Sequence, residues 1–298
     1  MTTHELQLGD QRAQVSTHGG RLIAYAVDGR ELLAGQENPS RFAYRGSVLA
    51  PWPNRVAGGR WTWQGRELRL PVNDPDSQSA LHGLAVDVTF EAANVTATAV
   101  ELGYDLPPHE GYPFALRITA AYALTPDGLV CSLSARNTGS GDAPVGLGVH
   151  PYLAAPEYVD DLVLTVPADT VWEGNAAWEE TGRQPVGATG LDFRTPRRLG
   201  ATVLDTVFTD LQPEESGRTA TRISLPDGAG VSVWAGPTAR WWLLYSADTL
   251  APGDQRRSLA VEPMTCPPNA LNSGEIDRLA PGETLSLDWG ITLTPPAH

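Results

Sequence analysis

The sequence predicts an all-β protein built as a large antiparallel β-sandwich. Apolar and polar residues alternate with a period of two in segments spread over the whole 298-residue chain. Asp-Gly pairs separate several of these segments, as they do in hairpins. No long stretch has the 3.6-residue apolar period of a helix, and 30 glycines and 25 prolines favour many short strands joined by turns.

The strands are predicted where the alternation is clearest. In LRITAAYAL (116–124), every second residue from Leu116 to Leu124 shares one face. In LDWGITLTP (287–295), Leu287, Trp289 and Ile291 alternate with smaller or polar residues. The segments GVSVWAG (230–236) and RWWLLYS (240–246) have the same character.

Turns are predicted at Asp-Gly pairs between apolar stretches, with both residues of each pair at positive φ. A further hairpin is predicted after Trp61 and Trp63. The chain has no linker, low-complexity tract or repeat, so residues 1–298 are expected to form one domain. The turn pairs are 28–29, 64–65 (Gln-Gly), 127–128 and 227–228.

Charge and residue usage exclude several function classes. The formal net charge is −14, so neither nucleic acid nor an anionic membrane is expected as a partner. The absence of lysine excludes Schiff-base chemistry and a P-loop. Two cysteines, with no signal-like start and no apolar run of about 20 residues, indicate reduced thiols in a cytoplasmic protein.

Two of the six histidines have settings that suit catalysis. His82 lies in SALHGLA, between a leucine and a glycine. His150 lies in GLGVHPYL, at the end of an apolar run and before a proline that ends the strand. Taken alone, each is explained as a hydrogen-bonded structural histidine.

Three further segments place polar groups beside apolar ones. In APWPNRVAGGRW, prolines and glycines frame Asn54 and Arg55, whose amide and planar guanidinium suit paired oxygens. Glu262, in LAVEPMTCPPNALNSGE, is expected directly after an apolar strand, where apolar neighbours raise a carboxyl pKa toward the range of a general base. Asp205 lies in LDTVFTDL. The alternatives are a surface arginine, a salt-bridged glutamate and a capping aspartate.

In this order along the chain, the motifs resemble those of the aldose 1-epimerase (galactose mutarotase) family. They are PNR-x-x-x-G, LHG, HPY, D-x-x-F, a late EP with a loop rich in proline and asparagine, and a final PGE, from about Asn54 to Trp289. The form EPMTCPPNALNSG is similar to the aldose 1-epimerase-like branch. The resemblance implies the galactose mutarotase-like supersandwich fold, with neither a cofactor nor a metal.

The resemblance also implies roles for individual residues. Glu262 would be the general base and His150 the general acid. One of Trp241 and Trp242 is a candidate for stacking on the sugar, although core packing explains both. The residues that would bind the sugar are Asn54, Arg55, His82 and Asp205.

The expected function is interconversion of the α and β anomers of a free aldose such as glucose or galactose. Ring opening needs only a base for the anomeric hydroxyl and an acid for the ring oxygen, so the partner is a small sugar and no cofactor is required. The wide sequence separation of His82 and His150 argues against a metal site. The oligomeric state is not predicted.

Three alternatives stay open. A hexose-phosphate 1-epimerase would need further basic groups, for which Arg60 and Arg240 are candidates. A glycoside hydrolase would use two carboxylates, such as Asp205 and Glu262, and would leave both histidines without a role. A non-catalytic sugar-binding or sensing protein would keep the cleft without the chemistry.

Overall fold

The alternation in the sequence becomes burial in the computed structural model, which describes residues 2–34 and 43–294. In β12 (Leu116–Thr125), alternate residues from Leu116 to Leu124 are buried, and the residues between them are half-buried. In β27 (Thr284–Thr294), Leu287, Trp289 and Ile291 are buried as expected. Every paired strand in the described ranges is antiparallel, so the predicted all-β sandwich is confirmed.

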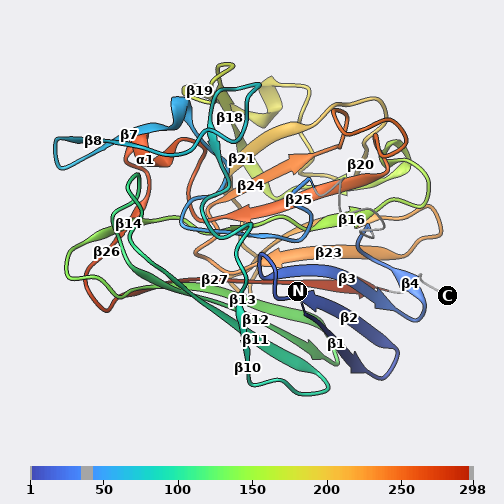
Figure 1. Ribbon diagram of the computed structural model, residues 1–298. Coiled ribbons are helices and arrows are strands. Elements are labelled where there is room, and N and C mark those ends of the chain that lie inside the picture. Colours follow the sequence, from blue (N-terminus) through green and yellow to red (C-terminus); the bar gives the residue numbers. More distant parts are fainter. Residues whose placement is uncertain (1, 35–42, 295–298) are drawn as a thin grey trace.

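Two large sheets form the layers of the sandwich (Figure 1). The nine-stranded sheet contains, in spatial order, β10 (Glu91–Ala93), β11 (Ala99–Leu106), β12, β13 (Gly128–Asn137), β27, β23 (Gly230–Ala235), β22 (Thr219–Ser224), β17 (Val163–Thr165) and β20 (Arg197–Arg198). The eight-stranded sheet contains β19 (Glu180–Pro185), β18 (Ala168–Gly174), β21 (Asp205–Leu211), β24 (Trp241–Tyr245), β25 (Ser258–Met264), β15 (Gly148–Val149) and β5 (Val48–Leu49), with β16 (Tyr152–Ala154) also paired to β25.

Smaller elements complete the fold. The strands β1 (Thr3–Leu8), β2 (Gln11–Ser16), β3 (Arg21–Val27) and β4 (Arg30–Glu31) form a four-stranded sheet, whose β1 and β2 contact β12. Three strand pairs are β6 (Arg55–Val56) with β9 (Ala80–Leu81), β7 (Arg60–Trp63) with β8 (Arg66–Arg69), and β14 (Ala143–Val145) with β26 (Asp277–Leu279). The helical segments are η2 (Ala57–Gly59), η3 (Val159–Asp161), η4 (Val186–Ala188) and α1 (Ala270–Ser273).

Strand β24 shows how the sandwich separates core from site. Trp242 and Leu244 belong to the main core, and the indole nitrogen of Trp242 donates to the Thr219 hydroxyl of β22, 3.2 Å away. Leu243 packs in a separate cluster on the opposite, outer face, and Tyr245 contacts that cluster. Core packing therefore holds one face of β24 in place, and the side chains of its opposite face can line a site.

The hairpins form where they are predicted, but two of the turns have another geometry. Both residues have positive φ at 28–29 and at 64–65, as expected. At 127–128 and 227–228 only the glycine does. In both places a proline precedes the aspartate and favours the first central position of a type I turn, where φ is negative.

Two further findings bear on the chemistry of the chain. Cys131 and Cys266 are buried free thiols. Within the described ranges, no helix has the length and apolar character that crossing a membrane requires.

Candidate active site

A cavity of about 200 Å³ opens on the outer face of the eight-stranded sheet. Strands β21, β24 and β25 contribute its floor, and the segments that follow β5, β9 and β15 contribute its walls. All six residues that the sequence assigns to the site line this cavity. The lining residues are Ala43, Tyr44, Asn54, Arg55, Leu81, His82, His150, Tyr152, Asp205, Leu243, Tyr245, Thr249, Leu250 and Glu262.

Glu262 owes its position to β25, whose seven residues are all buried because both faces of the strand are covered. It lies opposite Leu243 of β24 and is 1% exposed. The expectation that Glu262 follows the strand is wrong. The strand continues to Met264, which pairs with both Trp241 and Gly148.

His150 directly follows β15, as predicted, and its ring meets Glu262. Its backbone N–H donates to the Ser47 carbonyl at 3.2 Å, and its carbonyl accepts from Gly46 N–H at 2.8 Å. These bonds fix the residue at the end of the strand. Nε2 of His150 lies 3.2 Å from Oε1 of Glu262, and both side chains are almost fully buried.

His82 lies beside His150, with the ring centroids 5.2 Å apart. The backbone N–H of His82 donates to the Asn54 carbonyl at 2.8 Å. The backbone N–H of Asn54 donates in turn to Nδ1 of the His82 ring at 3.2 Å. Desolvation lowers the pKa of His82 well below its usual value, so the ring is neutral. Because Nδ1 accepts a hydrogen bond, the proton of the ring is on Nε2.

Gly83 holds the loop that carries His82 against the loop that carries Asn54. It forms a parallel bridge to Ala50 and has a φ of 79°. A Cβ at this position would overlap the carbonyl oxygen of Ala50. Only glycine allows the backbone before Asn54 to approach the backbone after His82 so closely.

Burial sets the protonation of the central pair. Desolvation raises the pKa of Glu262 well above its usual range, and Asp205 adds to this effect. Desolvation also lowers the pKa of His150 to about 3, and the nearby charges of Arg45 and Arg55 contribute. Both shifts favour the uncharged form, so the carboxyl of Glu262 keeps its proton and the ring of His150 is neutral. The pair therefore holds one proton between two atoms 3.2 Å apart.

Arg55 is fixed from two sides at the cavity wall. Its Nε donates to Oδ2 of Asp74 at 2.7 Å, and its guanidinium carbon lies 4.4 Å from the centroid of the Trp178 ring. Desolvation alone would raise the pKa of Asp74, but hydrogen bonds from Ser77 and Arg55 hold it below its usual value. Desolvation raises the pKa of Asp205, the first residue of β21, and Arg55 opposes that shift.

Tyrosines supply the aromatic surface of the cavity. Tyr44, Tyr152 and Tyr245 line it. The Tyr152 ring is almost parallel to that of His150, with centroids 4.9 Å apart and an angle of 7°. The buried Arg45 also packs on Tyr152, with its guanidinium carbon 4.6 Å from the centroid of the tyrosine ring. The acid candidate thus stands at one end of a stack that includes a cation.

The fold brings one ligand atom from each of His82, His150 and Glu262 within 4.8 Å of the others. Sequence separation is therefore no argument against a metal. The hydrogen bonds of His82 are a stronger argument against a metal. Nδ1 of His82 is engaged by Asn54 N–H and Nε2 carries the proton, so a metal would have to displace one or the other. The arrangement favours proton transfer over ligation.

Comparison with known proteins identifies the family. The sequence model described as aldose 1-epimerase matches residues 3–292. The chain belongs to the aldose 1-epimerase family. Aldose 1-epimerases are isomerases that act on small sugars, so the enzyme class and the kind of partner follow.

Relatives and solved structures agree with this membership. The uncharacterized protein YihR of Escherichia coli strain K12 is 36% identical over 277 residues, which cover 91% of this chain and 86% of that protein. Galactose mutarotase of Rattus norvegicus is 33% identical over 167 residues, covering 53% of this chain and 47% of the relative. A solved aldose epimerase homologue from C. elegans has the same fold, with a TM-score of 0.87 over 99% of both chains at 19% identity.

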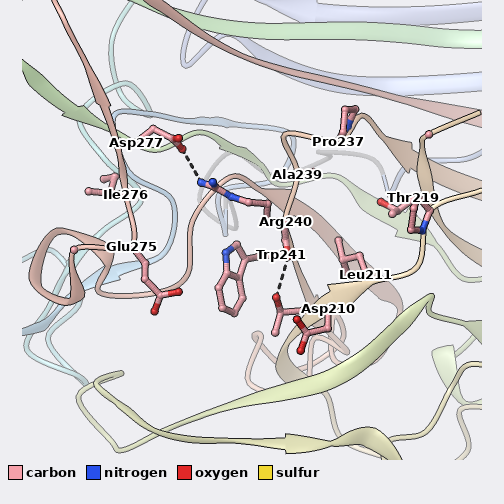
Figure 2. Close-up of a pocket in the computed structure, with 14 residues that line it drawn as sticks. Asp210, Leu211, Thr219, Pro237, Ala239, Arg240, Trp241, Glu275, Ile276 and Asp277 are labelled. Carbon is pink, nitrogen blue, oxygen red and sulfur yellow. Dashed lines mark hydrogen bonds and ion pairs between the residues drawn. The ribbon is translucent and has the colours of Figure 1, made fainter.

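A separate cavity of about 800 Å³ lies at the far end of β21 and β24 (Figure 2). Trp241 and Arg240 line it, and Arg240 bonds Asp277 at 2.7 Å and the Thr265 carbonyl. Trp242 is in the core. Neither tryptophan lines the cavity that holds Glu262 and His150. Core packing, which explains both residues from the sequence, holds for Trp242 in the main core and for Trp241 in the cluster with Leu243.

Sequence reasoning missed several residues of the candidate site. Tyr44 and Tyr245 carried no motif, and Tyr152 was given no role although it is the last residue of HPY. Asp74 and Trp178, which fix Arg55, lie in loops far from it in the sequence. Nothing in the local sequence marks them, because their partner is set by the fold.

Proposed function

We propose that this protein is a mutarotase that interconverts the α and β anomers of a free aldose such as glucose or galactose. The observation that supports the proposal is the buried contact of 3.2 Å between His150 Nε2 and Glu262 Oε1 at one end of a sugar-sized cavity. Two groups that share one proton at this distance can serve neighbouring oxygens of one sugar.

In the proposed mechanism, the shared proton passes from Glu262 to His150 across their 3.2 Å contact when the sugar binds. The Glu262 carboxylate then accepts the proton of the anomeric hydroxyl while the His150 imidazolium donates a proton to the ring oxygen. The ring opens to the aldehyde. Rotation about the bond between the first two carbons turns the other carbonyl face toward the hydroxyl that closes the ring. Closure reverses both proton transfers, so the pair regains its starting state without a cofactor.

Neighbouring groups hold the sugar during this rotation. The neutral His82 donates from Nε2 near the ring oxygen, and Asn54 orients that ring. Arg55 and Asp205 form charge-assisted hydrogen bonds with the hydroxyls far from the reacting carbon. Desolvation inside the cavity strengthens each of these contacts.

An unphosphorylated sugar fits better than a hexose phosphate. Arg55 is the one basic residue other than histidine among the lining residues within the described ranges, and Asp74 already neutralises it. Arg240 lines the separate cavity, and Arg60 is absent from the lining of the catalytic cavity. A phosphate would therefore meet the carboxylate of Asp205 without a free cation to balance it.

We also propose that residues 1–298 act as one catalytic domain in the cytoplasm. Residues from Asn54 to Glu262 line a single cavity, which supports one folded unit. The free thiols of Cys131 and Cys266 suit a reducing compartment.

The decisive experiment follows mutarotation of freshly dissolved α-glucose and α-galactose by polarimetry. Glu262→Gln and His150→Asn are each expected to lower kcat by about 100- to 10,000-fold, because each removes one proton-transfer group. Glu275→Gln makes the same chemical change in the separate cavity and should keep the wild-type rate. Near wild-type turnover by either site variant would overturn the assigned pair. A wild-type protein that binds sugar without turnover would instead be a sensor.

A further inference from the structure

Two buried polar atoms at the end of β15 have no hydrogen-bond partner among the described residues. One is Nδ1 of His150, the ring nitrogen that does not meet Glu262. The other is the hydroxyl oxygen of Ser47, which is fully buried. A buried polar atom without a partner costs stability, so such atoms in a native structure indicate a role or a neighbour within reach.

The strand register places Ser47 directly beside His150. Strands β15 and β5 pair Val149 with Val48. The next pair along is His150 with Ser47, and the backbone N–H of His150 donates to the Ser47 carbonyl at 3.2 Å. Side chains of directly opposite residues share a face of the sheet, with their Cβ atoms about 5 Å apart. The Ser47 hydroxyl and the His150 ring are therefore neighbours on the outer face.

A tight turn fixes Ser47 at this position. Its backbone N–H donates to the Tyr44 carbonyl at 3.0 Å, and the third residue of the turn, Gly46, has a φ of 69°. Gly46 N–H donates to the His150 carbonyl, so Gly46 and Ser47 together oppose one residue, as in a β-bulge with glycine at its first position. A Cβ on Gly46 would overlap the carbonyl oxygen of Leu22. The backbone therefore holds the serine against the acid candidate.

The protonation of the central pair determines what Nδ1 needs. The Glu262 carboxyl keeps its proton and donates it to Nε2 of His150, 3.2 Å away. Nε2 is then an acceptor, so the one proton of the neutral ring is on Nδ1. When His150 takes up a second proton in the proposed mechanism, Nδ1–H becomes one of the two donors of a buried cation. Such a cation is costly unless its donors are hydrogen-bonded.

We propose that Ser47 is a positioning residue for the acid, and that its hydroxyl oxygen accepts a hydrogen bond from Nδ1–H of His150. The inference rests on the proposed mutarotase function. The hydroxyl is one bond beyond its Cβ, so rotation between the staggered positions about Cα–Cβ brings it to the ring. The bond supports the proton on Nδ1, keeps Nε2 directed at Glu262 and the sugar, and stabilises the imidazolium.

The kinetic test follows mutarotation of α-glucose by polarimetry. Ser47→Ala removes the acceptor and is expected to lower kcat about 10- to 100-fold, as the loss of a hydrogen bond to a charged group does. KM should not change, because Ser47 is not among the described residues that line the cavity. Ser47→Thr keeps the hydroxyl and should keep the wild-type kcat.

Thr221→Val is the matched control. It removes another fully buried hydroxyl that has no partner among the described residues, on β22 of the nine-stranded sheet. Its kcat should equal that of the wild type. An unchanged kcat in Ser47→Ala, an equal loss in Ser47→Thr, or an effect confined to KM would overturn the assigned role. Thermal melts confirm that the variants fold.

Proton and nitrogen-15 NMR of protein labelled at histidine tests the hydrogen bond without turnover. The signals of His150 are assigned by their loss in His150→Asn. In the wild type, the proton on Nδ1 should resonate downfield, as a hydrogen-bonded imidazole N–H does. It should move upfield in Ser47→Ala and return in Ser47→Thr.

Two NMR results would overturn the inference, namely a wild-type ring protonated on Nε2 alone and an Nδ1–H resonance that Ser47→Ala leaves unchanged. If the wild type turns over no sugar, the proposed function fails. An Nδ1–H resonance that shifts in Ser47→Ala would then still support the hydrogen bond between the two side chains.

Discussion

At the scale of single residues, the central fact is that a carboxyl and an imidazole are buried together. Glu262 is 1% exposed and His150 is 5% exposed. Burial penalises the charged form of each, and proton transfer needs that form. In the proposed mechanism this desolvation makes the pair reactive, and it also lowers the stability of the fold.

The cost should be measurable in Glu262→Gln. Below the usual carboxyl pKa both folded and unfolded states bind the proton, so Glu262 costs nothing. As the pH rises above that value, the Glu262 carboxyl ionises in the unfolded state but keeps its proton in the folded state, because burial raises its pKa there. The folded state therefore loses stability relative to the unfolded state. We expect the variant to melt a few degrees above wild type at pH 8, with no difference near pH 4.

Calorimetry across that pH range checks this expectation. Glu275→Gln is the control, because it makes the same chemical change at an exposed position. A stability gain for Glu262→Gln that is the same at every pH would contradict the desolvation argument.

Arg45 should tune the acid without touching the sugar. Its guanidinium lies on Tyr152, which stacks on His150, and its charge lowers the pKa of His150. Glu262, His82, Tyr44 and Arg55 also face or influence that ring, and they are unchanged in the test. Removing the Arg45 charge therefore raises the pKa of His150 toward its ordinary value.

In Arg45→Met we expect the limb of the kcat/KM profile that reports the imidazole to move to higher pH. Arg45→Lys keeps the charge and should keep the limb in place. A shift of the same size in both variants would mean that Arg45 acts through packing alone.

The site residues that could be predicted from the sequence are those that lie in a local sequence motif. Six side chains carried motifs and all line the cavity. Asp74 and Trp178 did not, because what matters is their contact with Arg55, which only the fold creates. Arg45 was equally hidden, since stacking through Tyr152 leaves no pattern in the chain.

At the scale of elements, β24 carries core and site on opposite faces. Trp242 is fully buried between the sheets, and Tyr245, three residues on, lines the cavity. Strand alternation predicts this split directly. It fails for β25, where both faces are covered and no period remains, which explains why Glu262 was expected after the strand.

The two faces of β24 should respond differently to substitution. Trp242→Ala leaves a cavity in the core and should reduce the free energy of unfolding by about 3–5 kcal/mol. Tyr245→Phe removes one hydroxyl at the cavity and should change the melting temperature by less than about 2 °C while raising KM. Chemical denaturation together with steady-state kinetics separates the two effects. Equal destabilisation by both variants would contradict the division of the strand into two faces.

At the scale of the molecule, a single hydrophobic cluster joins all three larger sheets. Leu6 of the four-stranded sheet, Ile118 of the nine-stranded sheet and Leu244 of the eight-stranded sheet belong to it. We expect one cooperative thermal transition, in which far-ultraviolet and near-ultraviolet circular dichroism change together. Separate transitions for secondary structure and tryptophan environment would contradict the proposal of one domain.

The tight crossing at Gly83 bears on how this protein tolerates change. No side chain fits between that position and Ala50, and the crossing aligns Asn54 with His82. In a saturation library scored by catalytic output, codon 83 should therefore be as intolerant as the acid–base codons, although its residue meets no sugar. A map of intolerant positions would overstate the number of groups that take part in the reaction.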